Sequence, residues 1–212
     1  MIIDYKYNSA GGRRDFIKKY IRDQKLENCI DIGASAMFWS YPECNFVADI
    51  VDPSKNDVTF FKINLEDKNT WKELLETVEL NGKFDFSICS HTLEDVFNPI
   101  DLIELLQKIS NSGFIAIPSK WDEMSFLHNN NYRGNAHHKQ FFDISDDKLI
   151  IYPKFSWIEN NSKSDELLLG DQGRELSFIW HEKIPFKVFG KDRPFNSDGE
   201  LILNFYNDLI KK

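Results

Sequence analysis

The sequence of 212 residues is long enough for one domain with a sizeable core, and its 42 % hydrophobic share excludes global disorder. The formal charge of −8 argues against non-specific binding to nucleic acid, so we expect no nucleic-acid partner. Cys29, Cys44 and Cys89 have no metal-binding spacing and indicate a reducing compartment. With no apolar leader and no apolar run approaching 18 residues, we expect a cytoplasmic protein without membrane contact.

The first predicted element is a helix over residues 13–24, which follows a flexible polar approach at residues 1–12. Apolar residues recur there with the spacing of one helical face, namely Phe16, Ile17, Tyr20 and Ile21. The opposite face is basic and carries Arg13, Arg14, Lys18 and Lys19. This basic face is either solvated or caps a pocket, where it would attract an anionic substrate.

Strands then alternate with helices up to residue 118. Short apolar runs predict strands at residues 29–32, 45–50, 58–63, 84–89 and 114–117. Between them, Trp71, Leu74, Leu75 and Val78 follow helical spacing, and a second helix begins with Asn98 as N-cap and Pro99 at its first position. This alternation predicts βαβ units and a parallel sheet with right-handed crossovers.

The pattern changes after residue 118. Residues 119–140 are polar and irregular, and a loop of that length inside a compact domain usually carries function. Further strands are expected at residues 149–152, 176–180 and 186–189, the last two as a candidate antiparallel pair. Ser197 and Glu200 form a capping-box pattern before a C-terminal helix.

A small-residue turn with a carboxylate at its entry, Asp31-Ile32-Gly33-Ala34-Ser35, follows the strand at residues 29–32. Glycine permits unusual backbone angles and the close approach of a ligand to backbone N–H groups. Asp49 ends the next strand, where its carboxylate can accept hydrogen bonds from two hydroxyl groups. Asp52 competes for that role, or Asp49 is simply a turn carboxylate. The pattern favours a nucleoside-type ligand at the carboxyl ends of neighbouring strands.

The segment from Phe84 to Val96, reading FDFSICSHTLEDV, together with Asn98-Pro99 and Gly113–Pro118, resembles the fourth and fifth strands of class I S-adenosylmethionine-dependent methyltransferases. The resemblance covers residues 28–118 and is to the small-molecule branch. It implies a three-layer Rossmann-like α/β fold, with a mainly parallel seven-stranded sheet and an antiparallel strand near the C-terminus. It further implies a single domain over residues 1–212, with an N-terminal helix or lid (1–27), a cofactor-binding half (28–118) and an acceptor-side half (119–212).

The same resemblance implies S-adenosyl-L-methionine as cofactor and a small-molecule or glycan-like acceptor. Its expected cofactor contacts are Asp31, Gly33, Ala34, Ser35, Asp49, Asn64, Leu65 and Ser90. The expected catalytic residues are His91, His137 and His138, any of which could act as a base. Tyr132-Arg133-Gly134 offers an anion-binding fork.

Three further points of the sequence bear on these assignments. Ser35 and Met37 stand where the family has its second and third motif glycines, which keeps open a degenerate cofactor-binding module without turnover. A nucleotide-sugar-related α/β enzyme is the other alternative. No metal is expected, because no spacing enforces a site on His91, Asp95, His137 and His138, although their side chains are of the ligand type.

Overall fold

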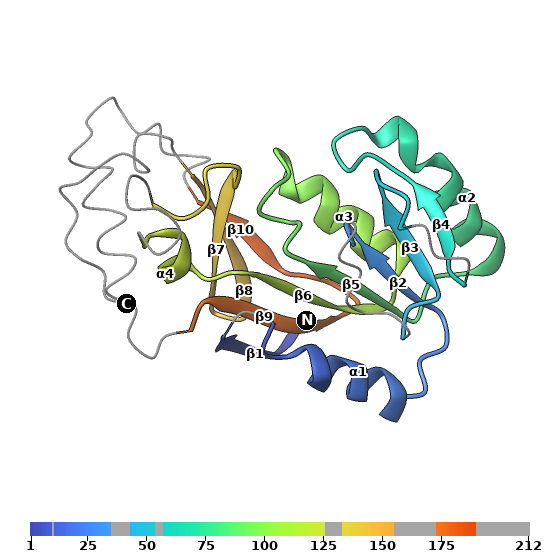
Figure 1. Cartoon of the computed structure of the whole chain (residues 1–212), viewed down its shortest axis with the longest axis horizontal. Helices are drawn as coiled ribbons and strands as arrows, with labels where there is room; N and C mark the ends of the chain where they lie inside the picture. Colours follow the sequence, from blue (N-terminus) through green and yellow to red (C-terminus); the bar gives the residue numbers. More distant parts are fainter. Residues whose placement is uncertain (10, 35–42, 54–56, 126–132, 155–172, 190–212) are drawn as a thin grey trace.

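The computed structural model describes residues 1–9, 11–34, 43–53, 57–125, 133–154 and 173–189. This part of the chain contains a seven-stranded sheet, a three-stranded sheet and helices that cover the larger sheet (Figure 1). The predicted turn residue Ser35, its neighbour Met37, Tyr132 and the predicted helix after Ser197 lie outside the described residues.

The large sheet has the strand order β1-β9-β6-β5-β2-β3-β4. Its parallel strands are β2 (Cys29–Ile32), β3 (Phe46–Asp49), β4 (Thr59–Lys62), β5 (Phe86–Ser90) and β6 (Ser112–Pro118). Every residue of β2 and β6 is buried, as expected of parallel strands covered on both faces. β9 (Glu175–His181) runs antiparallel beside β6. The predicted α/β fold, a mainly parallel seven-stranded sheet with an antiparallel strand near the C-terminus, is therefore confirmed.

Helices cover both faces of this sheet (Figure 1). α1 (Arg14–Asp23) packs Ile17 and Ile21 against Cys29, Phe86 and Phe114 on one face. The other face holds the 3₁₀ helix η2 (Lys68–Trp71), α2 (Lys72–Asn81) and α3 (Pro99–Ile109). Asn98 occupies the predicted N-cap position of α3, but its side chain makes no capping hydrogen bond. No described helix is long and apolar enough to cross a membrane.

The prediction of a flexible approach at residues 1–12 is wrong, because β1 (Ile2–Asn8) is the edge strand of the large sheet. It pairs antiparallel with β9, with Ile2 opposite Trp180 and Asn8 opposite Glu175. Its side chains do not alternate cleanly between buried and exposed, and its register shifts between Ile3 and Lys6. This strand forms because it pairs with β9, which lies far along the chain, and a local sequence pattern cannot reveal such a partner.

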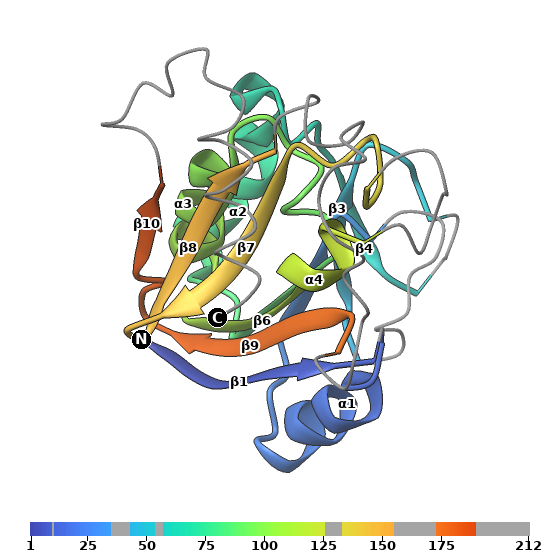
Figure 2. The ribbon, with the colours of Figure 1, turned by 90° about the vertical axis from the view of Figure 1, so that its left-hand side faces the viewer.

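The smaller sheet contains β7 (Gln140–Ser145), β8 (Lys148–Pro153) and β10 (Phe186–Val188). Figure 2 shows β7 and β8 side by side, with β10 next to β8. β7 and β8 form a hairpin whose turn residues, Asp146 and Asp147, have φ of 51° and 56°. The expected antiparallel pairing of the last two strands is wrong: β10 pairs in parallel with β8. The irregular region predicted at residues 119–140 also contains α4 (Lys120–Glu123).

Candidate functional site

A cavity of about 540 Å³ lies at the carboxyl ends of the parallel strands. The chain runs from β2 outward to β3 and β4, then returns to place β5 on the other side of β2. Ligands of open α/β sheets bind in the crevice at such a change of direction. The cavity is lined from four strand ends, by Gly33 and Ala34, by Asp49 and Ile50, by Ile63, Asn64 and Leu65, and by Ser90, His91 and Thr92.

Gly33 brings the loop after β2 against the loop after β5. Its φ is +71°, and a Cβ atom at this position would come within 2.4 Å of the Thr92 side chain. The Thr92 hydroxyl donates to the Gly33 carbonyl at 3.3 Å, and the Gly33 N–H donates to the carbonyl of Ala48 at 2.9 Å. Gly33 therefore supplies space and backbone freedom, while its own N–H is already used within the sheet.

Among the predicted cofactor carboxylates, only Asp49 lines this cavity. Asp49 is 7 % exposed, and its Oδ1 accepts a hydrogen bond from the Val51 N–H at 3.0 Å. Asp52, the competing candidate, is exposed and is not among the described lining residues. Asp31 is buried within β2 and does not line the cavity either. The geometry favours Asp49 as the carboxylate that a bound ligand meets.

The wall on the side of β4 is held by the backbone and by Glu66, which the sequence did not single out. The Asn64 side chain accepts from the Glu66 N–H at 3.0 Å, and the Asn64 carbonyl accepts from the Trp71 indole at 2.9 Å. Glu66 Oε1 in turn accepts from the Phe97 N–H at 2.7 Å. The loops after β4 and β5 are thus tied together across the cavity. Among the described residues, Arg14, Asp95 and Val96 also line the cavity.

His91 follows β5 and sits between two buried glutamates. Its Nε2 is 3.0 Å from Glu175 and its Nδ1 is 3.4 Å from Glu94. Burial alone would lower the pKa of His91, but its contacts with these two carboxylates raise that pKa to about 10. His91 also has a φ of +51°, an uncommon conformation for a residue other than glycine. A protonated ring has no lone pair to accept a proton, so this geometry does not favour His91 as a general base at neutral pH.

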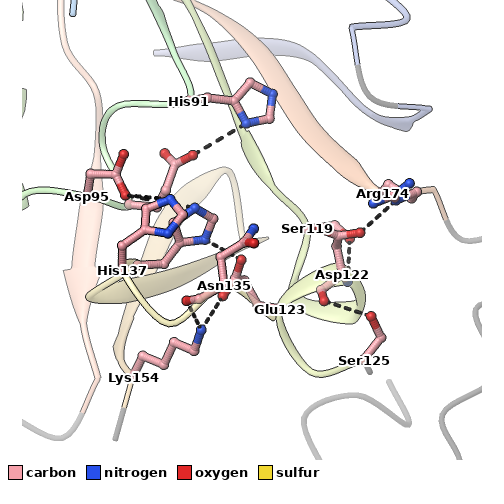
Figure 3. Close-up of polar contacts among 12 residues, drawn as sticks. His91, Asp95, Ser119, Asp122, Glu123, Ser125, Asn135, His137, Lys154 and Arg174 are labelled. Carbon is pink, nitrogen blue, oxygen red and sulfur yellow. Dashed lines mark hydrogen bonds and ion pairs between the residues drawn. The ribbon is translucent and has the colours of Figure 1, made fainter. Parts of the chain in front are cut away.

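A second cavity of about 200 Å³ adjoins the first, because His91 and Asp95 line both. It brings together the three histidines predicted from the sequence. The rings of His137 and His138 lie 4.4 Å apart. Figure 3 shows His137 beside Asp95. The remaining lining residues come from several loops and from α4, namely Glu94, Pro118, Asp122, Asn135 and Arg174.

His138 is held by a chain of buried charges. Its Nδ1 contacts Glu123 Oε1. Glu123 Oε2 accepts from the Lys154 ammonium at 2.8 Å (Figure 3). Burial alone lowers the pKa of His138, but the bond to Glu123 and the nearby carboxylates raise it overall. Arg133, part of the predicted anion fork, is buried and donates to the carbonyl of Met124 instead of lining either cavity.

No protein-family model and no curated protein sequence matches this chain. Solved structures similar to it include a cyclopropane-fatty-acyl-phospholipid synthase-like protein from Lactobacillus casei, with 13 % identity and a TM-score of 0.33 over 51 % of this chain and 49 % of that one. The small RNA methyltransferase HEN1 has 11 % identity and a TM-score of 0.48, covering 81 % of this chain and 25 % of that one. An O-methyltransferase family protein from Burkholderia thailandensis has 10 % identity and a TM-score of 0.44, covering 82 % of this chain and 56 % of that one. This chain spans less than two thirds of the length of each.

Proposed function

We propose that this chain transfers a methyl group from S-adenosylmethionine to a small-molecule or glycan-like acceptor. The observation that carries the proposal is the larger cavity at the change of strand direction, where the Asp49 carboxylate and the Gly33 turn meet the ends of β4 and β5. The sequence resemblance over residues 28–118 supports the same chemistry.

The larger cavity fits the proposed cofactor in size and in the polar and apolar groups that line it. Its volume of about 540 Å³ falls in the range of roughly 300–1,000 Å³ that is usual for small-molecule sites. Asp49 offers acceptor oxygens for ribose hydroxyls, and Ile50, Ile63 and Leu65 offer apolar contact for a base. When bound, the cofactor supplies an electrophilic methyl group.

The second cavity is the proposed acceptor site, because it shares His91 and Asp95 with the first. Methyl transfer requires the acceptor atom in line with the methyl group, so the contribution of the protein is mainly to orient two ligands across that boundary. The lining is polar, with Asn135 and an Asp122–Arg174 pair at 2.8 Å. Such a lining fits a hydroxylated acceptor. At the boundary between the two cavities, the predicted site residues His137 and His138 lie beside Asp95.

Isothermal titration with S-adenosylhomocysteine tests the cofactor assignment. We expect one binding site in the unaltered chain. Replacing Asp49 with Asn should weaken binding by about 5- to 150-fold, equivalent to roughly 1–3 kcal/mol, through the loss of a charge-assisted hydrogen bond. The matched control is Asp52→Asn, which removes the same charge three residues away and outside the cavity. The affinity of the Asp52→Asn variant for S-adenosylhomocysteine should equal that of the unaltered chain.

Three results would count against parts of this proposal. An absence of binding at millimolar cofactor contradicts the methyltransferase assignment altogether. Equal losses in Asp49→Asn and Asp52→Asn would show that Asp49 does not hold the ribose. Tight binding without methyl transfer to any acceptor in a broad screen would instead favour the non-catalytic module, for which Ser35 and Met37 are the motivation.

A further inference from the structure

We propose that Asp95, His137 and His138 bind one divalent transition-metal ion in the second cavity. Asp95 Oδ1 lies 3.7 Å from His137 Nε2 and 3.8 Å from His138 Nε2, and the candidate ligand atoms all lie within 4.8 Å of one another. Bonds of about 2.0–2.2 Å around a tetrahedral ion place ligand atoms roughly 3.3–3.6 Å apart. The two distances from Asp95 exceed this spacing by only a few tenths of an ångström, and the two histidine nitrogens lie no more than 4.8 Å apart.

The local chain geometry directs two neighbouring side chains to one point. Consecutive residues ordinarily point to different sides of a helix or strand. Here the His138 N–H bonds to the Asn135 carbonyl at 3.2 Å, and the rings of His137 and His138 meet at an angle of 74°. Both Nε2 atoms approach the same oxygen of Asp95. A shared ion explains why two imidazoles converge on one carboxylate.

The contacts of His138 prepare it as a ligand. Its Nδ1 bonds to Glu123, so that Nε2 is the nitrogen left to face Asp95. Histidines that bind metals usually donate their other ring N–H to a carboxylate or carbonyl in this manner, which fixes the tautomer and the orientation of the ring. Glu123 is itself held by Lys154 at 2.8 Å, and Lys154 also donates to the Asn135 carbonyl at 2.7 Å. The loop that carries both histidines is thereby anchored.

A further buried acidic side chain lines the same cavity. Glu94 is 1 % exposed and lines the cavity, yet neither of its carboxylate oxygens has a hydrogen-bond partner among the described residues. Its one described ionic contact is with His91 Nδ1 at 3.4 Å. A carboxylate held by one contact at 3.4 Å can accept further hydrogen bonds. A water molecule on an ion bound by Asp95 and the histidines would supply a donor.

The ligand set indicates the class of ion. Two imidazoles and one carboxylate suit Zn²⁺, Co²⁺ or Mn²⁺, whereas Mg²⁺ and Ca²⁺ prefer oxygen ligands alone. Three protein ligands leave coordination positions open for water or a ligand. Because Asp95 also lines the larger cavity, those positions would adjoin the proposed acceptor. That last consequence rests on the proposed function, whereas the binding of the ion does not.

The test uses the full chain, stripped of metal with a chelator that is then removed. Titration with Zn²⁺ should show one equivalent bound with a dissociation constant in the micromolar range or below. Mg²⁺ should bind at least about 100-fold more weakly than Zn²⁺. Co²⁺ should give visible absorption bands that Zn²⁺ abolishes. His137→Gln should lower the affinity for Zn²⁺ by at least about 10-fold, and so should His138→Gln. The matched control is His181→Gln at the end of β9, outside the cluster.

His137 is 67 % exposed in its side chain, so its replacement should leave the fold intact even where that of buried His138 does not. Zinc affinity in His137→Gln equal to that of the unaltered chain would overturn the proposal. Weak binding of several equivalents, with Co²⁺ bands absent, would do the same. Titration of the metal-free chain with S-adenosylhomocysteine separates this proposal from the proposed function, because each kind of binding can fail while the other is retained.

Discussion

Gly33 and Thr92 illustrate how the size of one residue shapes the larger cavity. The carbonyl of Gly33 accepts from Thr92, and a side chain at position 33 would overlap that threonine. Gly33, which the sequence predicts as part of a ligand-binding turn, lines the cavity and also packs between two loops. Asp49, the predicted carboxylate contact, lines the same cavity.

Gly33→Ala should destabilise the chain and weaken cofactor binding. The left-handed φ costs about 1–2 kcal/mol in any L-residue, and overlap with Thr92 adds about 1–3 kcal/mol. Gly11→Ala is the matched control, because Gly11 has a similar φ of +68° but its nearest neighbour is the flexible end of Arg14 at 3.2 Å. Urea unfolding compares the two. Equal losses of free energy of unfolding would show that the Thr92 contact does not matter.

His91 makes the stability of the chain depend on pH. The pKa of His91 is raised from an ordinary 6.5 to about 10, so the folded chain holds this proton more tightly than the unfolded chain. The resulting stabilisation is complete below pH 6.5 and is lost as the pH rises towards 10. The carboxylates responsible are Glu175 and Glu94.

We expect the difference in unfolding free energy between the unaltered chain and His91→Asn to shrink between pH 6.5 and about 10. Asn is the replacement of choice because it tolerates the left-handed backbone at this position. Urea unfolding at several pH values measures the difference, and groups common to both chains cancel. A difference that stays constant over this range would contradict the contacts of His91 with the two glutamates.

Between elements, a buried ion pair connects α4 to β7. Lys120 Nζ lies 2.6 Å from Asp143 Oδ2, and both residues are more than nine-tenths buried. The Tyr7 hydroxyl of β1 also bonds to Asp143, so one carboxylate joins the small sheet to the edge of the large one. This position matters for function because α4 carries Asp122 and Glu123, which belong to the second cavity and to the support of His138.

Lys120→Met should lower the free energy of unfolding by about 3–5 kcal/mol, because it leaves the Asp143 charge buried without its cation. Lys19→Met is the control: it breaks an exposed i,i+4 pair with Asp23, for which about 0–1 kcal/mol is expected. Thermal or urea unfolding distinguishes the two. A loss in Lys120→Met no larger than that of the control would show that the pair does not hold these elements together.

The sequence could predict the elements whose apolar residues recur with a regular helical spacing or form a continuous run typical of a buried strand. The parallel strands and α1, α2 and α3 were found because their apolar residues mark one face or a fully buried strand. β1 and β7 were missed, and the partner of β10 was wrong, because strand pairing depends on segments distant in the sequence. For the same reason, the sequence could name Asp95, His137 and His138 as ligand-type side chains but could not predict that they meet, because the histidines lie more than 40 positions further along the chain.

At the scale of the whole molecule, the strand order places the residues that line the larger cavity at one edge of the sheet. The loops that follow β6 line much of the smaller cavity beside it. The first part was predictable, since parallel strands with a change of direction gather their carboxyl ends at one edge. The second was not, because the loop at residues 133–139 and Arg174 have no periodic pattern. The two cavities share a boundary at His91 and Asp95, which is the arrangement that two-ligand transfer requires.

A crystal structure with S-adenosylhomocysteine tests the central claim, that the larger cavity is the cofactor site, most directly. We predict the ligand at the carboxyl ends of β2 to β5, with its ribose hydroxyls within hydrogen-bonding distance of Asp49 and its sulfur towards the boundary at His91. Ligand bound elsewhere on the chain, or crystals in which the cavity stays empty at millimolar ligand, would contradict the account.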